Sequence, residues 1–330
     1  TPHERLLGLV VFPDREPFLI CPQMEVDSAE NSGWGNEIIG YQDTDDPWRM
    51  IQYAFSSRKV GNVRSAAIEK STIPFAYGES LKNLFPGLGF QNAEEKMNEL
   101  RMIKDEKEVK CLREAARYAD LAVEIGVDAI AEGKTEMEIL ALIEYEMKKK
   151  GIRQMAFSTM VLAGENAAHP HGHPGNRAIQ KGDFVLFDLG VVVDGYCSDI
   201  TRTVAFDHVT DKQRKVYETV LRAQETALAE SKTGARIGDL DKGARAVIEQ
   251  AGYGDYFPHR LGHGLGVEAH EAPSMSSNND NLLKAGMVYT IEPGIYTVDD
   301  GIGVRIEDDV YITDSGCETL TKFPKQLQIV

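Results

Sequence analysis

Hydrophobic and polar positions follow two different patterns along the chain, and the change falls near residue 95. Before it, short apolar runs typical of strands alternate with segments of helical periodicity. The strand-like runs cover residues 6–12, 17–21, 37–41 and 63–68, and the helical segments cover residues 47–55 and 77–84. This alternation predicts an α/β domain over residues 1–95, followed by a second domain over residues 96–330.

The second domain repeats one plan twice. A long helix is expected over residues 105–130, and another begins at Thr135, which forms a capping box with Glu138, and ends at Gly151. The same plan recurs with helices over residues 211–230 and from about 238 to 252. Each helix pair is followed by a strand hairpin that carries acids. We therefore expect an α+β domain built by internal duplication, with halves that face each other across a pseudo-two-fold axis.

The two hairpins are the most informative feature of the chain. Each has an Asp-Gly pair between apolar runs, at Asp194-Gly195 and at Asp300-Gly301. Asp-Gly favours a two-residue type I′ turn, in which both residues need a positive φ. With such turns, the two acids of each hairpin lie one diagonal step apart on one face, roughly 7 Å or less apart at Cβ. The acids are Asp188 and Asp199 in the first hairpin, and Glu292 and Glu307 in the second.

Four carboxylates that converge among apolar neighbours predict a cation site. A single strand acid is more often on a solvated face, but Asp188 follows Phe187 and Glu292 follows Ile291. Four like charges in such a place do not stay ionised unaided. A structural calcium site is the middle alternative, because calcium takes oxygen ligands only.

A histidine favours other metals. Residues 261–267 alternate apolar positions or His263 with glycine, which predicts a strand whose glycine face admits neighbouring backbone. A lone histidine there is usually a core residue. Together with four acids, His263 predicts two adjacent divalent ions such as Mn²⁺, Co²⁺ or Zn²⁺.

Composition indicates an intracellular enzyme. The chain has 330 residues, 52 acidic against 36 basic ones, and a net charge of −16. This charge disfavours nucleic acid and anionic membranes as partners, and no apolar run approaches the length of about 18 residues that a membrane span needs. The four cysteines are scattered and are expected to be reduced thiols. We therefore expect a cytoplasmic protein.

The residues resemble a known family. The stretches FDLG, YCSDITR, GHGLG, IEPGIY and GVRIEDDV are similar to those of the pita-bread metallopeptidases, which include methionine aminopeptidase, aminopeptidase P and the proline dipeptidases. The resemblance covers nearly the whole chain and is closest to the bacterial proline dipeptidases. It implies a creatinase-like N-terminal domain, here expected to lack its first helix and strand, and a pita-bread catalytic domain. It also implies five metal ligands, namely Asp188, Asp199, His263, Glu292 and Glu307, for two ions, with Mn²⁺ the first choice.

The resemblance also selects substrate residues. Residues 169–173 hold three histidines, among which the spacing alone does not choose; the resemblance selects His171 for substrate binding. It gives His270 the role of polarising the scissile carbonyl. Arg305 is expected to brace the metal carboxylates, to bind substrate, or both. Glu271 is expected to be a capping or surface residue, and Cys197 to lie behind the ligands.

The implied activity is hydrolysis of Xaa-Pro dipeptides by a water that bridges two metals, with Glu292 as proton shuttle. One departure affects this expectation: several family dipeptidases carry an arginine after His-Glu-x-Pro that binds the substrate carboxylate, and here Ser274 stands there. Arg5 is the expected substitute, reaching the site of a partner in a homodimer. The alternatives are an Xaa-Pro aminopeptidase acting on longer peptides and a metal-free peptide-binding module.

Overall fold

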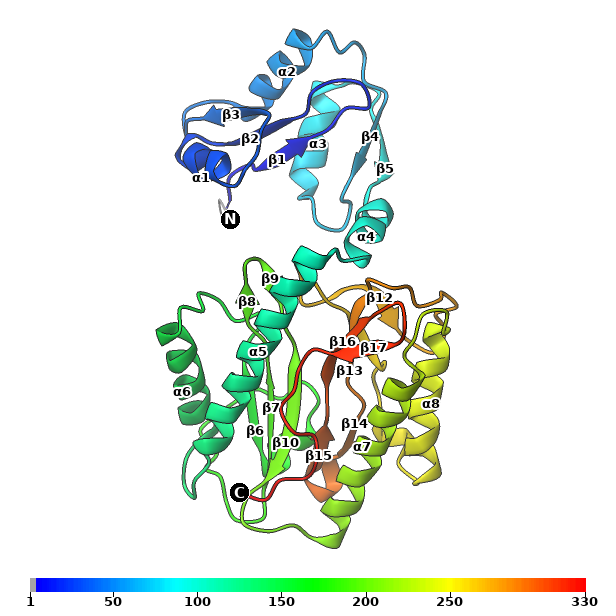
Figure 1. Cartoon of the computed structure of the whole chain (residues 1–330). Coiled ribbons are helices and arrows are strands. Elements are labelled where there is room, and N and C mark those ends of the chain that lie inside the picture. Colours follow the sequence, from blue (N-terminus) through cyan, green and yellow to red (C-terminus); the bar gives the residue numbers. More distant parts are fainter. Residues whose placement is uncertain (1–3) are drawn as a thin grey trace. The chain divides into compact units, whose positions relative to one another are not determined.

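The computed structural model describes residues 4–330 and divides into two compact units between Met97 and Asn98 (Figure 1). The N-terminal unit contains a sheet of β1 (Gly8–Val10), β2 (Phe18–Pro22) and β3 (Glu37–Tyr41), in that order. A second sheet pairs β4 (Ser65–Ile68) with β5 (Gly89–Asn92) in parallel. The helices are α1 (Val26–Asn31), α2 (Pro47–Ser57) and α3 (Phe75–Leu84). The expected α/β pattern is confirmed, although α1 and β5 were not predicted.

Helix α4 (Glu94–Met102) spans the division between the units and was also not predicted. Its sequence, EEKMNELRM, is mostly polar, and none of its residues is buried. The helical spacing of apolar residues, on which the prediction of helices rests, is therefore not evident in this segment. Within residues 4–330, no helix is both long enough and apolar enough to cross a membrane.

The four long helices of the C-terminal unit, residues 98–330, begin and end close to the predicted positions. They are α5 (Glu106–Asp128), α6 (Glu136–Lys149), α7 (Asp211–Glu230) and α8 (Ile237–Gln250). The capping box of Thr135 and Glu138 is present at α6, and Gly151 follows that helix with a φ of 89°. These local signals fix helix ends because they satisfy backbone groups that the helix itself leaves free.

Two larger sheets and two short strand pairs make up most of the rest of the C-terminal unit. One has the order β10-β7-β6, from β6 (Met160–Ala163), β7 (Phe184–Leu189) and β10 (Ile200–Ala205). The other has the order β12-β11-β13-β16-β17, from β11 (Gly262–Gly264), β12 (Glu271–Met275), β13 (Val288–Ile291), β16 (Asp308–Ile312) and β17 (Cys317–Thr319). The hairpin tips are the pairs β8 (Val192–Val193) with β9 (Tyr196–Cys197), and β14 (Gly294–Thr297) with β15 (Ile302–Arg305).

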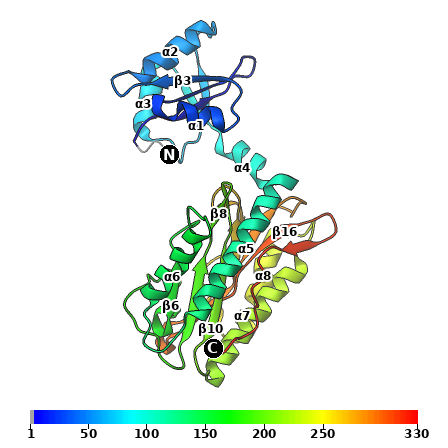
Figure 2. The ribbon, with the colours of Figure 1, turned by 60° about the vertical axis from the view of Figure 1, so that its left-hand side comes forward.

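Each half of the C-terminal unit has its own core. Helices α5 and α6 lie beside β6, β7 and β10, whereas α7 and α8 lie beside the strands of the second sheet (Figures 1 and 2). Val123, Ile143 and Phe187 belong to the first core, and Val220, Leu240 and Ile291 to the second. A helix pair followed by an acid hairpin thus occurs twice, as expected from the sequence.

The first acid hairpin, residues 184–205, has the predicted turn and register. Asp194 and Gly195 have φ values of 49° and 86°, as a type I′ turn requires. Asp188 pairs with Thr201 across β7 and β10. Asp199 lies two residues before Thr201, so the two acids are one diagonal step apart on the same face.

The second acid hairpin, residues 288–312, has a different register from the one predicted. Its strands pair Gly294 with Arg305 and Ile291 with Asp308, so Glu292 and Glu307 stand directly opposite each other. The loop contains a 3-10 turn over Val298–Asp300, and only Gly301 has a positive φ, of 62°. The prediction of a two-residue turn was wrong because Asp300 remains in the 3-10 turn, whereas a type I′ turn needs it at positive φ.

Candidate active site

Strand pairing is interrupted at Asp199 in the first hairpin and at both acids in the second. In the second hairpin, β13 ends at Ile291 and β14 begins only at Gly294. The backbone N–H of Glu292 instead donates to the carbonyl of Leu261 at 2.8 Å, and that of Glu307 donates to the carbonyl of Thr201 at 3.1 Å. The acids are therefore fixed by neighbouring segments, one of which belongs to the first hairpin.

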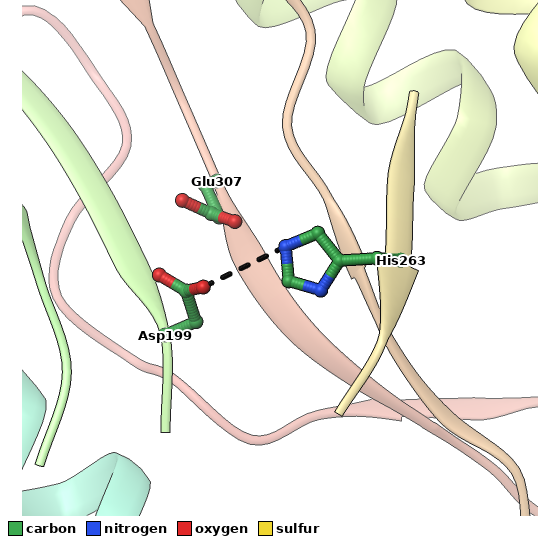
Figure 3. A group of neighbouring side chains, drawn as sticks. All are labelled: Asp199, His263 and Glu307. Carbon is green, nitrogen blue, oxygen red and sulfur yellow. Dashed lines mark ion pairs between the residues drawn. The ribbon is translucent and has the colours of Figure 1, made fainter. Parts of the chain in front are cut away.

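Three of the candidate ligands form a tight group. Asp199, His263 and Glu307 each offer one ligand atom, and these atoms all lie within 4.8 Å of one another (Figure 3). Nε2 of His263 is 3.7 Å from Oδ2 of Asp199 and 3.4 Å from Oε1 of Glu292. The fifth candidate, Asp188, forms an ion pair with Arg305, and its charge helps to raise the pKa of Asp199 and of Glu307, after burial and other carboxylates. The structure thus brings all five sequence-predicted residues to one place.

The glycines beside His263 serve close backbone packing. A Cβ at Gly262 would lie 2.0 Å from the carbonyl oxygen of Thr290, and one at Gly264 would lie 2.1 Å from that of Ala272. The expected glycine face is confirmed at these positions. The strand itself is shorter than expected, since β11 covers only Gly262–Gly264 and Val267 is 47% exposed. The pairing with β12 shifts after His263, which ends the regular strand.

The electrostatics of the group suit a multivalent cation. Burial raises the pKa of Glu292 to about 7, and burial together with neighbouring carboxylates raises those of Asp199 and Glu307 well above the ordinary range. Burial lowers the pKa of His263 to about 3, which keeps its imidazole neutral and able to donate a lone pair to a metal. Oδ1 of Asp199 is buried without a hydrogen-bond partner. A buried acceptor of this kind needs a partner, and the donor set fits divalent metal ions.

Arg305 braces Asp188 through a buried network. Its Nε donates to Oγ1 of Thr201 at 3.0 Å, its Nη1 donates to Oη of Tyr296 at 2.8 Å, and its Nη2 binds Asp188. Oη of Tyr296 also lies 3.0 Å from Nε2 of His259. Burial raises the pKa of Tyr296 to about 12, so the phenol stays protonated at neutral pH.

Sequence reasoning did not identify His259 or Tyr296. Two signals were available: Tyr296 lies four residues after Glu292, and His259 lies four residues before His263. An even spacing places residues on one face of an extended strand. The signal is weak because the strand is interrupted between Glu292 and Tyr296.

The two predicted substrate histidines are both exposed. The ring of His270 lies 4.1 Å from the ring of His263, centroid to centroid, and burial followed by the charge of Arg260 lowers the pKa of His270. His171 is among the positive charges that, behind burial, lower the pKa of His259 to about 4. His171 is thus near His259, and both substrate roles stay predictions.

The segment that carries His270 is held on two sides. Nζ of Lys104 lies 3.2 Å from Oε2 of Glu271, with both side chains at least 96% buried. On the other side, the backbone N–H of Cys197 donates to the carbonyl of Gly266 at 2.7 Å. Glu271 is therefore not a surface residue, but its Oε1 accepts the backbone N–H of Glu268 at 3.1 Å, which is a capping contact. Burial raises the pKa of Cys197 to about 11, and a protonated thiol is a poor metal ligand.

Arg5 lies in the N-terminal unit and has an ionic partner there. Its Nε and Nη2 donate to the carboxylate of Asp43 at 2.8 and 3.1 Å, and the ion pair keeps the pKa of Asp43 below its ordinary value. Any contact of Arg5 with a substrate carboxylate has to compete with this bidentate pair.

Comparisons with known proteins agree with this geometry. Residues 110–314 match the model of metallopeptidase family M24, and residues 1–103 match the creatinase/prolidase N-terminal domain. A Bacillus subtilis protein provisionally named as the dipeptidase YkvY is 56% identical over 329 residues, which cover 100% of this chain and 90% of the relative.

Two solved structures extend the comparison. The prolidase from Thermococcus sibiricus has a TM-score of 0.93 and 36% identity, and the match covers 100% of this chain and 89% of that one. An X-Pro aminopeptidase from Thermotoga maritima has a TM-score of 0.88 and 33% identity, with 97% and 90% covered. The expected creatinase-like N-terminal domain and pita-bread catalytic domain are confirmed.

Proposed function

The chain belongs to metallopeptidase family M24, and from this premise we propose that it is a dinuclear Xaa-Pro dipeptidase. The observation that carries the proposal is the buried group of Asp199, His263 and Glu307, with Glu292 at 3.4 Å from the imidazole. Four carboxylates with one neutral histidine suit two hard or borderline divalent ions better than a single soft one.

We assign the five ligands of these ions to Asp188, Asp199, His263, Glu292 and Glu307. Mn²⁺ is the first choice because oxygen donors outnumber nitrogen four to one, with Co²⁺ or Zn²⁺ as alternatives. When bound, such ions supply a nucleophilic water at neutral pH and Lewis acidity toward a carbonyl. Membership of a metallopeptidase family agrees with a requirement for divalent metal ions.

Glu292 is our candidate for the proton shuttle. Thr290 Oγ1 donates to its Oε1 at 3.3 Å, which orients the carboxylate. From this place Glu292 takes a proton from the attacking water and delivers it to the departing proline nitrogen. That nitrogen belongs to a tertiary amide without N–H, so this proton is the one that lets it leave as an amine.

The histidines bind and polarise the substrate in this proposal. His270 stands beside His263 and is exposed, so its ring can donate to the oxygen of the scissile carbonyl as negative charge develops there. His171 contributes to binding the substrate. Arg305 is buried and acts mainly by bracing Asp188 and Tyr296.

Hydrolysis of matched peptides tests the proposal. Purified protein should be freed of metal with a chelator, reloaded with Mn²⁺, Co²⁺ or Zn²⁺, and assayed on Ala-Pro, Ala-Pro-Ala and Ala-Ala. We expect cleavage of Ala-Pro that needs metal, and little cleavage of Ala-Ala. Undiminished turnover in metal-free protein, or saturation by a single ion, would contradict the dinuclear assignment.

The second candidate is an Xaa-Pro aminopeptidase, which the likeness to the Thermotoga maritima enzyme and the serine at position 274 favour. Faster cleavage of Ala-Pro-Ala than of Ala-Pro would select it. A failure to bind metal at all would select the peptide-binding module. We further propose a cytoplasmic homodimer in which Arg5 approaches the partner's site, which sedimentation of wild-type protein and kinetics of Arg5→Ala would test.

A further inference from the structure

Arg260 is an exposed arginine whose side chain reaches the ligand face of the second sheet. Its Nη1 donates to Oγ of Ser274 at 3.1 Å. Ser274 pairs directly opposite His263 in the ladder of β11 and β12, and directly opposed residues project their side chains to the same face. The guanidinium of Arg260 therefore lies on the side of the sheet from which His263 enters the metal group.

The residues on either side of Arg260 also belong to the site. The carbonyl of Leu261 accepts the backbone N–H of Glu292 at 2.8 Å, and Nε2 of His259 lies 3.0 Å from Oη of Tyr296. These two contacts fix the segment of Arg260 beside Glu292 and beside the hydrogen-bond network of Arg305.

The other candidate arginines are already occupied. Arg305 is 4% exposed and binds Thr201, Tyr296 and Asp188, and Arg5 pairs with Asp43. Within residues 4–330, no carboxylate forms an ion pair with the guanidinium of Arg260, and its side chain donates only to the neutral hydroxyl of Ser274. A guanidinium has five N–H donors, so most of those of Arg260 remain available for an anion.

We propose that Arg260, held in place by Ser274, binds the C-terminal carboxylate of the Xaa-Pro substrate. This inference rests on the proposed function and names the residue that distinguishes a dipeptide from a longer chain. The carboxylate of a dipeptide lies one residue, or about 3.5 Å, beyond the scissile bond. A cation that receives it has to stand at the edge of the metal group and remain open to solvent, as Arg260 does.

The contact gives selectivity through charge. A guanidinium can bind a carboxylate with two parallel N–H···O bonds, whereas a peptide with a third residue presents a neutral amide at the same place. Losing a hydrogen bond to a charged group typically weakens binding about 10- to 100-fold. Because Arg260 is exposed and outside the core, its replacement should leave the fold intact.

The test compares Arg260→Gln with wild type, both loaded with Mn²⁺, on Ala-Pro and on Ala-Pro-amide, which differ only in the terminal charge. We expect the variant to lose about 10- to 100-fold in kcat/KM for Ala-Pro, mainly through KM, and less than about 3-fold for the amide. Arg260→Lys should retain part of the preference. Competitive inhibition by proline, but not by prolinamide, should weaken in parallel, which gives a readout independent of turnover.

An exchange of the contacting pair sharpens the test. Arg260→Ser should lose the preference for the carboxylate, and Arg260→Ser combined with Ser274→Arg should recover part of it, because the cation returns from the adjacent strand. Arg5→Ala is the competing control. If Arg5→Ala removed the preference and Arg260→Gln did not, the assignment to Arg260 would be wrong.

Two outcomes separate this inference from the proposed function. If wild type cleaves Ala-Pro and Arg260→Gln loses equally on Ala-Pro and its amide, the inference fails and the dipeptidase proposal stands. If wild type cleaves Ala-Pro-Ala but not Ala-Pro, the dipeptidase proposal fails, and the inference fails with it.

Discussion

The two acid hairpins of the C-terminal unit each bring two acids to the same site, but they do so with different turns. Both contain Asp-Gly, but Asp194 has a φ of 49° in a type I′ turn, whereas Asp300 belongs to a 3-10 turn and only Gly301 has a positive φ. The registers differ by two residues, so the acids are diagonal in the first hairpin and directly opposite in the second. A shift of two residues keeps every side chain on its face. The convergence of the acids is therefore insensitive to the turn.

The hairpins also contact each other through different residues. From the first hairpin, the hydroxyl of Thr201 donates to Oε2 of Glu307 at 2.5 Å. From the second, Arg305 forms an ion pair with Asp188, and the carboxylate of Asp309 accepts the backbone N–H of Asp199 at 3.0 Å. Three of the four acids, Asp188, Asp199 and Glu307, are thus held by residues of the other hairpin. The site requires both halves of the duplication, although each half has its own core.

Replacing one acid in each hairpin should have the largest effect. Asp199→Asn and Glu307→Gln each remove a ligand charge, so each should lower kcat/KM for Ala-Pro on the order of 10⁴-fold and reduce the bound metal. Mass spectrometry of bound metal and steady-state kinetics measure this. The matched controls are Asp194→Asn and Asp299→Asn, which alter exposed acids of the same two hairpins. Full metal content in either ligand variant would show that its hairpin does not contribute as we propose.

The next largest effect concerns the link between the hairpins. Arg305→Met leaves the buried Asp188 without its cation, and breaking a buried pair typically lowers the free energy of unfolding by about 3–5 kcal/mol. The loss should be greatest in metal-free protein, because bound metal can compensate the charge of Asp188. Denaturant unfolding with and without Mn²⁺ measures the difference. Equal losses in both states would place Asp188 outside the reach of the metal.

His270→Ala removes a donor that lies in neither hairpin. We expect kcat to fall by roughly 10²-fold or more, because the contact strengthens as charge develops on the carbonyl oxygen. His171→Ala should instead raise KM with a smaller change in kcat. If both variants altered KM alone, the oxyanion role of His270 would have to be abandoned, and the hairpins alone would account for the chemical step.

Local signals explain how much of the fold could be predicted. Helix α7 covers Asp211–Glu230 as expected, because Thr210 caps its start and apolar positions recur at helical spacing. The face on which each acid lies followed from the two-residue period of a strand. That face stays the same although the turn of the second hairpin was predicted wrongly. The expectation of two divalent ions followed from the four converging acids together with His263, which disfavours calcium, and the resemblance to a family agreed with it.

Contacts between distant segments explain what the sequence did not show. Lys104 and Glu271 are 167 residues apart and meet as a buried pair, and His259 reaches Tyr296 across 37 residues. No local pattern marks either contact, because each depends on how whole elements pack. The loop of the second hairpin was predicted wrongly for a different reason. Its Asp-Gly pair is a strong local signal for a two-residue turn, but the chain forms a longer turn there.

Glycine and alanine substitutions at the two turn aspartates give the smallest effect and test the comparison most directly. At Asp194, where φ is positive, an alanine should be strained by about 1 kcal/mol and a glycine should not be. At Asp300, where φ is not positive, glycine should be the less stable choice by about 0.5–1 kcal/mol, because it adds freedom to the unfolded chain. Both substitutions at Asp300 remove the same ion pair with Lys212, so that contribution cancels. Denaturant unfolding of the four variants should give opposite orders of stability at the two sites. The same order at both would mean that the two hairpins turn alike, and the difference in register would then need another cause.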